Sequence, residues 1–539
     1  MSGFSIRQFK GIAPRTDPLL LADNQAQTAN NCTLRHGVMT PLSANLAVAA
    51  TLAKAGTKKT IYRFGHLMPS ELQYWFHWLD DVDVCKGQIF GDTSERTYYT
   101  GDSTNPPQVT NATMMLSGGG TLYPNASYTL GIPQPAATLL AVPAGTGTGI
   151  AETRVYTYTY VSAWGEEGLP ATASALVSVL PGQTVSLSNF SSAPVGVFNI
   201  ATKRIYRSLN GSYFFVAEIP VAVLTYSDAV LGENLSALLP SATYDMPPAT
   251  LIGLTNMANG IMAGFSGSDI YFCEPFKPYA WPLGYVQTVD FNIVALGATD
   301  TSLIVLTSGT PYLIQGSHPA NMGMVQINNP YPCMSKRSVC KIAGGIIYAS
   351  PAGLVLVSGA GAVVVTESLF TNKEWSALFT PSSIYGYVYD GRYIGFYITG
   401  GVQAGFIFDL YGGEFTTFDW YATAGYYDPQ LDALYLVVAG ALVKFDKGIT
   451  FQTAIWKTKK FYLSRPVNMS FIRIEAAAYP VSVQVFADGI SIGTFSIISP
   501  YAQRLPSGFL ANTWEISVTS AVNVNSIGIA QSIEELANG

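Results

Sequence analysis

The side chains that most often carry chemistry are few in this chain and far apart. Metal sites and His-based catalytic triads need such groups close together, yet no histidine has a second one two to four positions away. The five cysteines are odd in number and scattered, as expected of reduced, buried thiols. Cys333 and Cys340 could pair or share a metal, but no second Cys or His pair flanks them. The histidines are His36, His66, His77 and His318.

Acidic residues offer two further kinds of site. Asp80, Asp81 and Asp83 could bind Ca²⁺ in a loop, although a solvated turn between strands is the favoured interpretation. A glycosidase needs paired carboxylates, and a β-propeller can collect them from separate blades, so sequence spacing does not exclude such a pair. The acids inside the repeats described below are sparse and fall mostly at turn positions. Among them, we single out Asp269, Glu274, Asp390, Asp409 and Asp428.

Phosphate-binding and nucleic-acid-binding patterns are also missing from the sequence. No glycine-rich loop stands between a strand and a helix, and Lys457, Lys459 and Lys460, the one basic cluster, are better read as a solvated strand. The net charge of −6 argues against a protein that grips nucleic acid, because phosphate neutralisation needs clustered Lys and Arg. It is compatible with a wall along which DNA slides. We predict no catalytic, cofactor-binding or metal-binding residues, no cofactor and no enzymatic activity.

The elements that would position these residues repeat between Asn256 and Lys447. Each unit has short β-type runs separated by Gly or Asp turns, and all-β units of about 40–45 residues are typical of propeller blades. We expect six or seven blades, with N-terminal strands closing the ring. No Trp-Asp pair occurs, so the spacing carries this prediction. Equivalent points at Ile261, Ser302, Gly345, Tyr385 and Gly425 lie 41, 43, 40 and 40 residues apart.

Two further modules are expected beside the propeller, so the predicted fold is all-β. The strict alternation that places Tyr156, Tyr158 and Tyr160 on one face begins an inserted β-sandwich of fibronectin type III character. Alternating strands after Ile455 predict a second sandwich, and only the short run from Ser532 looks helical. The predicted domains are an extended N-terminal arm (1–50), the first part of the propeller (51–140), the insertion (141–247), the second part of the propeller (248–454) and the C-terminal β-sandwich (455–539).

Composition indicates that much of the surface is covered by other molecules. Charged residues are 12% of the chain against a usual figure near 25%, which leaves a lone monomer short of solubilising surface. No apolar run reaches the roughly eighteen residues that span a bilayer. The first residues lack the charged and apolar regions of a signal peptide, so we expect synthesis and assembly in the cytoplasm.

Several segments together resemble structural proteins of bacteriophage tails. Two of these segments lie near the N-terminus and start at Phe9 and Asn24. The others are the Arg-Thr-Tyr-Tyr-Thr-Gly-Asp segment from Arg96, the Ser-Pro-Ala-Gly-Leu segment from Ser350 and the Arg-Leu-Pro-Ser-Gly-Phe segment from Arg504. The order of modules is similar to the tail nozzle, or tail tubular B-type, proteins of short-tailed phages. Those are β-propellers with sandwich insertions that assemble as hexameric rings.

The resemblance implies a homohexameric ring in the virion tail, assembled in the host bacterial cytoplasm. Such a ring lies below the portal and adaptor, extends the DNA-ejection channel, retains the genome and anchors tail fibres. Double-stranded DNA passes through its lumen without specific binding, and its distal end can meet the host envelope. Two alternatives remain open: a receptor-binding fibre or baseplate module that contacts host glycans, and, less favoured, a propeller glycosidase.

Overall fold

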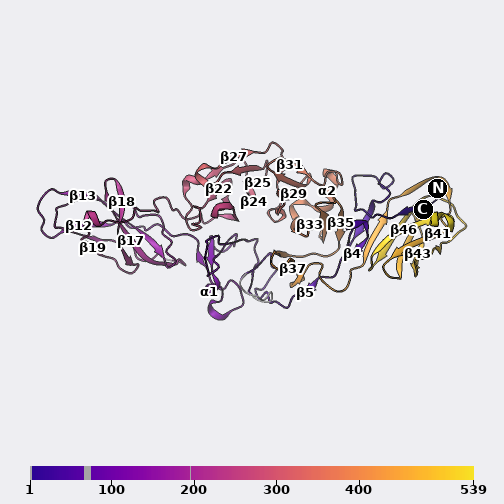
Figure 1. Cartoon of the computed structure of the whole chain (residues 1–539), viewed down its shortest axis with the longest axis horizontal. Helices are drawn as coiled ribbons and strands as arrows, with labels where there is room; N and C mark the ends of the chain where they lie inside the picture. The colour runs from indigo at the N-terminus through magenta and orange to yellow at the C-terminus, as the bar shows by residue number, and fades with distance from the viewer. Residues whose placement is uncertain (1–2, 66–73, 195, 301, 539) are drawn as a thin grey trace. The chain divides into compact units, whose positions relative to one another are not determined.

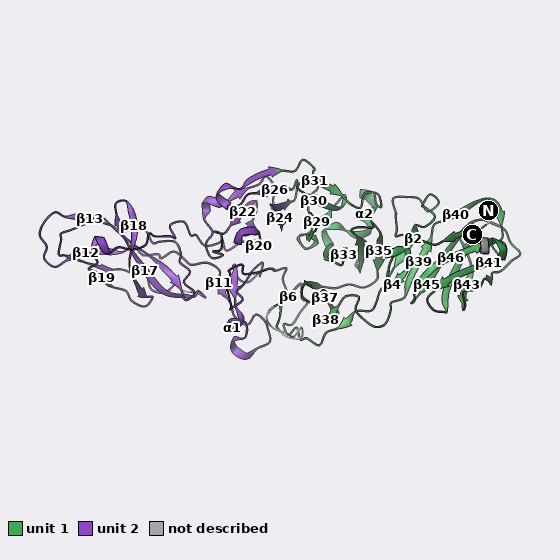
Figure 2. Cartoon of the chain, viewed as in Figure 1, with its two compact units in different colours: residues 1–79, 306–312, 326–539 green, residues 80–305, 313–325 purple. Residues whose placement is uncertain are grey.

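The computed structural model describes the whole chain except residues 1–2, 66–73, 195, 301 and 539. The chain is an all-β protein: a β-propeller carries an inserted fibronectin type III-like sandwich and a C-terminal sandwich, as the sequence predicts (Figure 1). No helix in the described part of the chain is long and apolar enough to cross a bilayer. The chain divides into two compact units, coloured in Figure 2, which are described separately below.

The purple unit of Figure 2 contains two complete four-stranded propeller sheets. Both are antiparallel meanders, and the first strands of the two sheets, β8 and β20, are neighbours. Their shared core includes Cys85, Tyr98, Leu254 and Trp281. The strands are β8 (Asp83–Lys86), β9 (Thr97–Thr100), β10 (Gln108–Thr110) and β11 (Tyr128–Thr129), then β20 (Ile252–Asn256), β21 (Met262–Ser266), β22 (Asp269–Phe272) and β23 (Gln287–Thr288). A third sheet, β24 (Ile293–Ala298), β25 (Ser302–Thr307), β26 (Tyr312–Gln315) and β27 (Gly323–Gln326), has residues assigned to each unit.

The green unit contains the later propeller sheets and shows how N-terminal strands join them. Strand β5 (Leu46–Ala47) completes the last repeat as its outer strand, pairing Ala47 with Val443. The two-stranded sheet of β6 (Thr60–Arg63) and β7 (Trp75–Trp78) follows, with β6 beside β36. The remaining strands are β28 (Cys340–Ile342), β29 (Gly345–Ser350), β30 (Gly353–Ser358), β31 (Gly361–Val364), β32 (Tyr385–Tyr389), β33 (Arg392–Thr399), β34 (Val402–Asp409), β35 (Phe415–Phe418), β36 (Ala424–Asp428), β37 (Ala433–Val438) and β38 (Ala441–Lys444).

The predicted period is present, but its phase changes once along the chain. Ser302 and Gly345 begin the second strands of their sheets, whereas Tyr385 and Gly425 lie in first strands. The shift arises because helix α2 (Asn372–Phe379) occupies the connection between β31 and β32. We did not predict this helix. It buries Trp375 and Phe379 and begins with a capping box between Thr371 and Glu374.

The inserted sandwich has eight strands and a core of its own. One sheet runs β12-β16-β19, a second runs β14-β17-β18, and β13 pairs with β15. Strand β14 is buried along its whole length, because the segment after Glu166 donates backbone hydrogen bonds to Tyr156, Tyr158 and Tyr160. The strands are β12 (Leu140–Ala144), β13 (Glu152–Arg154), β14 (Tyr156–Ser162), β15 (Val177–Val179), β16 (Thr184–Ser188), β17 (Ile200–Leu209), β18 (Ser212–Pro220) and β19 (Tyr226–Asp228).

The C-terminal sandwich is built from both ends of the chain. Strand β1 (Phe4–Ile6) pairs with β46 (Val524–Ala530), and β2 (Ala26–Asn30) pairs with β39 (Ala454–Thr458) on one side and with β35 on the other. The predicted N-terminal arm therefore contributes strands to this sandwich. The other strands are β40 (Phe461–Val467), β41 (Phe471–Ala476), β42 (Val481–Ala487), β43 (Ile490–Ile497), β44 (Gln503–Arg504) and β45 (Ala511–Ser520). The short helix α3 (Ile533–Asn538) follows them, as predicted.

Candidate functional site

The histidines and cysteines singled out in the sequence lie in separate places. Among the described residues, no group of three or more His, Cys, Asp or Glu side chains could hold a metal ion. Burial raises the pKa of the Cys333 and Cys340 thiols to about 12, so both stay protonated. Burial also lowers the pKa of His77 to about 4, and its ring accepts a hydrogen bond from the backbone N–H of Lys54. His66 lies outside the described residues.

The acids proposed as a Ca²⁺ loop interact with other parts of the protein. Asp80 accepts a hydrogen bond of 2.7 Å from the Ser103 hydroxyl, and Asp83 accepts one of 2.8 Å from the backbone N–H of Gly253. These bonds join β8 to the neighbouring turn and to β20. In the repeats, Asp269 accepts from Thr288, and Glu274 accepts from Tyr285. Each of these four carboxylates thus stabilises a local turn or strand contact.

Three other acids line one cavity of about 920 Å³, but the N-terminal segment binds them. Arg35 forms ion pairs of 2.6 Å with Asp390 and 3.1 Å with Asp409. Burial opposes ionisation of Asp409, yet backbone N–H donors and Arg35 together hold the pKa of that carboxyl below its ordinary value. Burial raises the pKa of Glu414, which accepts a hydrogen bond from the backbone N–H of Gly11. Through these contacts, the N-terminal segment is bound to strands β33–β35 at the cavity.

Asp428, the last of the five repeat acids singled out in the sequence, forms a buried ion pair with Arg63. Arg63 is 3% exposed and Asp428 is fully buried, and the pair joins β6 to β36. The basic cluster is also paired: Lys457 lies 2.7 Å from Glu515, and Lys459 lies 3.1 Å from Asp23. Lys460 donates its backbone N–H to Pro18. The contacts of Lys459 and Lys460 bind the N-terminal segment to the C-terminal sandwich.

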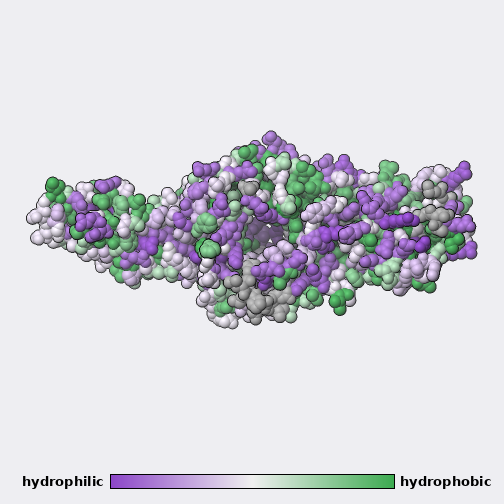
Figure 3. Space-filling view, viewed as in Figure 1, coloured by the Kyte–Doolittle hydropathy of each residue, from purple (hydrophilic) through white to green (hydrophobic). Residues whose placement is uncertain are grey.

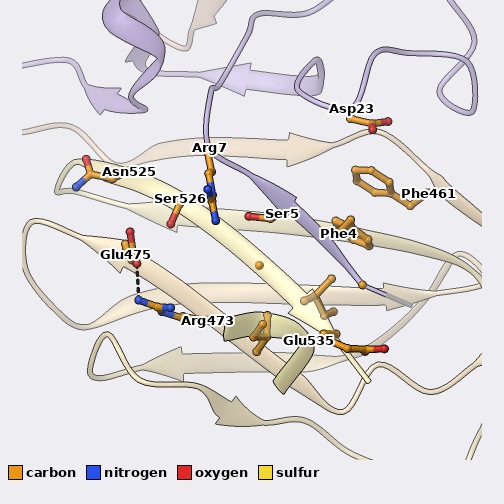
Figure 4. A pocket seen from close by; sticks show the side chains of 15 residues that line it. Phe4, Ser5, Arg7, Asp23, Phe461, Arg473, Glu475, Asn525, Ser526 and Glu535 are labelled. Carbon is orange, nitrogen blue, oxygen red and sulfur yellow. Dashed lines mark hydrogen bonds and ion pairs between the residues drawn. The ribbon is translucent and has the colours of Figure 1, made fainter. Parts of the chain in front are cut away.

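A second cavity, of about 720 Å³, opens on the C-terminal sandwich (Figure 4). Its wall combines β1 with β41 and β46, and Phe4 stacks on Phe461 with 3.7 Å between ring centroids. Arg473 and Glu475 form an ion pair of 2.5 Å on one side, and each is about two-fifths exposed. The lining mixes acidic and basic side chains in solvent, without a buried polar group that could define a ligand.

The turn between β14 and β15 places two buried glutamates at the base of the inserted sandwich. Glu167 accepts hydrogen bonds from Thr159 and Tyr206 and lies 2.9 Å from Arg204. Glu166 lies 2.9 Å from Arg96, which precedes β9 in the propeller sheet. From the sequence, this segment is predicted only as a turn. These contacts attach the insertion to the propeller sheet. We call Arg96, Glu166 and Glu167 the mooring residues, or together the mooring.

Burial sets the protonation of the mooring. It raises the pKa of Glu166 to about 7, even though the Arg96 guanidinium favours the charged carboxylate. Arg96 is held by Asp92 at 3.0 Å and lies over the Trp164 ring, 5.4 Å from its centroid. The mooring is therefore a desolvated charge network whose protonation changes near neutral pH.

The outer surface of the sheet β12-β16-β19, with neighbouring β15, carries no charged side chain on β12, β15 or β16. Alternate residues of these strands, such as Ala141, Val179 and Val185, face the core, so the residues between them face outward. We call the exposed set the neutral face; Leu140 is 58% exposed, Val142 48% and Leu176 64%. It consists of Leu140, Val142, Leu176, Ser178 and Ser186.

The other sheet of the same sandwich has an ordinary solvated surface. Arg204 on β17 pairs with Glu218 on β18 at 2.8 Å, and both side chains are about one-third exposed. Figure 3 shows hydrophobic residues at the surface of the insertion.

A sequence signal for the neutral face exists, since residues 103–151 and 168–202 contain no Asp, Glu, Lys or Arg. The average charge of the chain does not reveal this gap.

Comparisons with known proteins give no family assignment. No protein-family model matches the chain, and no curated protein matches it. Among solved structures, a virginiamycin B lyase from Staphylococcus aureus is 9% identical with a TM-score of 0.27, covering 57% of this chain and 98% of the lyase. The extracellular domain of a putative hybrid two-component system from Bacteroides thetaiotaomicron is 10% identical with a TM-score of 0.27, covering 95% and 82%. Likeness at this level carries no inference about function.

Proposed function

We propose that this chain is a structural subunit of a bacteriophage tail, of the nozzle type. Copies would form a ring, hexameric by family resemblance, that extends the DNA-ejection channel below the portal and adaptor and retains the genome. Fibre proteins would bind its outside, the distal end would meet the host envelope, and DNA would pass through the lumen without specific contacts. Assembly would take place in the bacterial cytoplasm, and no catalytic step belongs to this role.

The neutral face is the observation that carries the proposal. Charged residues are depleted at the centres of protein interfaces, and a contiguous apolar surface left in water favours association. The exposed Leu140, Val142 and Leu176 lie on a surface without charge, whereas the opposite sheet of the sandwich carries Arg204 and Glu218. This one-sided pattern supports a permanent protein partner rather than an anionic polymer, which would select Lys and Arg.

The acids that line the cavity of about 920 Å³ also support a structural role. Asp390, Asp409 and Glu414 are engaged by Arg35 and by the backbone of Gly11. A retaining or inverting glycosidase needs one carboxylic acid free to protonate the leaving group. In this cavity, each of the three carboxylates already has a partner from the N-terminal segment. We therefore prefer a scaffold to a glycosidase.

The test is electron microscopy of the purified full-length chain and of virions that contain it. We expect rings of six-fold symmetry, and we expect Leu140→Lys with Val142→Lys to weaken assembly or fibre attachment. Ser212→Lys, on the solvated sheet of the same sandwich, is the matched control and should leave assembly unchanged. A stable monomer that never associates with virions would defeat the proposal. Binding to host glycans without ring formation would favour a receptor-binding module instead.

A further inference from the structure

The last strand of the C-terminal sandwich presents an open edge. Strand β43 pairs with β42 on one side and ends the strand order of its sheet. Within the described part of the chain, no strand lies on its other side. An eight-residue edge in this state offers a row of backbone N–H and C=O groups to any incoming strand.

Several other outer strands in the described part of the chain are shorter than β43 or carry protection that it lacks. Natural edge strands are kept short or carry charged residues and proline. The outer strands β11 and β23 have two residues each, the outer strands β27 and β31 have four, and three longer outer strands contain proline or charged residues. Strand β12 contains Pro143, β18 contains Glu218 and Pro220, and β40 contains Arg465 and Pro466. From 489 to 503, the segment around β43 has no charged residue at all.

The hydrophobic core is also incomplete at this edge. Ile492 and Phe495 pack against the core of the sandwich but stay only half-buried. Around them, Ile490 and Ile498 are each 73% exposed, and Tyr501 is 79% exposed. An added strand would cover both the open backbone and these side chains. A β-strand with an apolar side and no charged residues fits this edge.

A second copy of β43 meets this description in a defined register. A bulge lies where Val485 and Phe486 pair with Gly493 and Ser491, and Gly493 adopts a positive φ of 140° there. The five residues from Gly493 to Ile497 are regular beyond it. Antiparallel pairing about Phe495 places Thr494 opposite Ser496, Gly493 opposite Ile497, and Phe495 opposite itself. Hydroxyl pairs and aromatic pairs are favourable across strands.

We propose that β43 is a self-association edge: two copies of this chain pair their β43 strands antiparallel about a two-fold axis at Phe495. The contact is isologous, since each copy offers the same surface to the other. It does not rest on the proposed tail function. A ring closes through head-to-tail contacts, whereas this contact joins chains two by two, so either can fail while the other holds.

Register-specific disulfide formation tests the pairing in the full-length chain. Directly opposite residues lie about 4.5–5.5 Å apart between Cα or Cβ atoms, within disulfide reach, while diagonal neighbours lie at about 7–8 Å. Under mild oxidation, F495C should therefore give a covalent dimer on a non-reducing gel. T494C and S496C should cross-link when the two chains are mixed and not when each is alone. The wild-type chain, whose five cysteines are free and mostly buried, is the control.

A charge on the edge tests the same contact without cysteine. Thr494→Lys should lower the fraction of paired chains measured by sedimentation, and circular dichroism should show an unchanged fold. Ser464→Lys on β40, in the same sandwich, is the matched control and should leave pairing intact. Equal cross-linking of F495C and the wild-type chain, or sedimentation of Thr494→Lys indistinguishable from wild type, would overturn the proposal. So would cross-linking of T494C alone, which requires another register.

Discussion

The two sandwiches of this chain are built in opposite ways. The insertion takes its eight described strands from residues 140–228, and its buried core, which includes Tyr158 and Ile205, comes from residues 139–219. The C-terminal sandwich takes β1 and β2 from the start of the chain, and its core continues into the propeller strands β33–β35. The insertion is therefore an autonomous module, whereas the C-terminal sandwich forms only when N-terminal strands pair with strands from the last part of the chain.

Isolated fragments should give the largest difference between the two. We expect residues 135–247 to fold alone and to unfold cooperatively, because no strand of that sandwich comes from elsewhere. Residues 455–539 alone should not unfold cooperatively, since two of their sheets lack β1 and β2. Thermal unfolding followed by circular dichroism measures both. Cooperative unfolding of 455–539 in isolation would show that the N-terminal strands are dispensable.

Buried charge should distinguish the sandwiches next. Arg207 is 2% exposed and pairs at 2.8 Å with the fully buried Asp228, which also accepts from Tyr156. Arg207→Met should cost about 3–5 kcal/mol of unfolding free energy. The variant leaves the buried Asp228 carboxylate with the more distant Arg154 as its cationic partner. Arg473→Met, which breaks a half-exposed pair in the C-terminal sandwich, should cost under about 1 kcal/mol. Denaturant titration of each variant decides; equal costs would remove the distinction.

The mooring should give the insertion a pH dependence of its own. Burial raises the pKa of Glu166 to about 7 from an ordinary 4.5, so the folded protein holds this proton more tightly than the unfolded chain. The associated stability is present below about pH 4.5 and is lost as the pH rises to about 7, at up to roughly 1.4 kcal/mol per pKa unit.

Glu166→Gln should flatten this part of the stability profile. Unfolding free energies measured between pH 4.5 and pH 8 on the full-length chain provide the comparison. Glu218→Gln, on the solvated sheet of the insertion, is the control and should keep the slope. An unchanged slope in Glu166→Gln would place the titration elsewhere.

The neutral face should give the smallest effect on stability. Leu140→Lys changes a side chain that is 58% exposed, so the isolated insertion should keep its unfolding free energy within about 0.5 kcal/mol. Its consequence should appear only in assembly. A loss of several kcal/mol in the isolated fragment would mean that Leu140 belongs to the core of the sandwich rather than to its surface.

Periodicity and alternation predicted the architecture because both arise from local physics. The repeat of turns and apolar runs gave the propeller, and the Tyr156–Tyr160 alternation gave the insertion. Helix α2 was not predicted, although Thr371 and Glu374 match the capping-box pattern. The surrounding repeat led to the prediction of strands there. The connection the helix occupies shifts the phase at Tyr385, which equal spacing alone does not reveal.

Contacts between distant segments could not be read from the sequence. Nothing local indicates that Ile6 pairs with Ile527 or that Arg35 binds Asp390 and Asp409. The mooring residue Glu166 lies in a turn-like segment, and only its burial against Arg96 gives it a role. The neutral face is different: its lack of charge is visible in the sequence, but its position on one surface needs the strand register.

Pairing of the first strand with the last has a consequence for biosynthesis. Strand β1 emerges from the ribosome long before its partner β46, because more than 500 residues separate Ile6 from Val524. At about 5–20 residues per second, β1 waits roughly half a minute to two minutes for that partner. The insertion can fold while this synthesis continues, whereas the C-terminal sandwich closes only once β46 has emerged, and the apolar residues Phe4 and Ile6 of β1 need protection from aggregation until then.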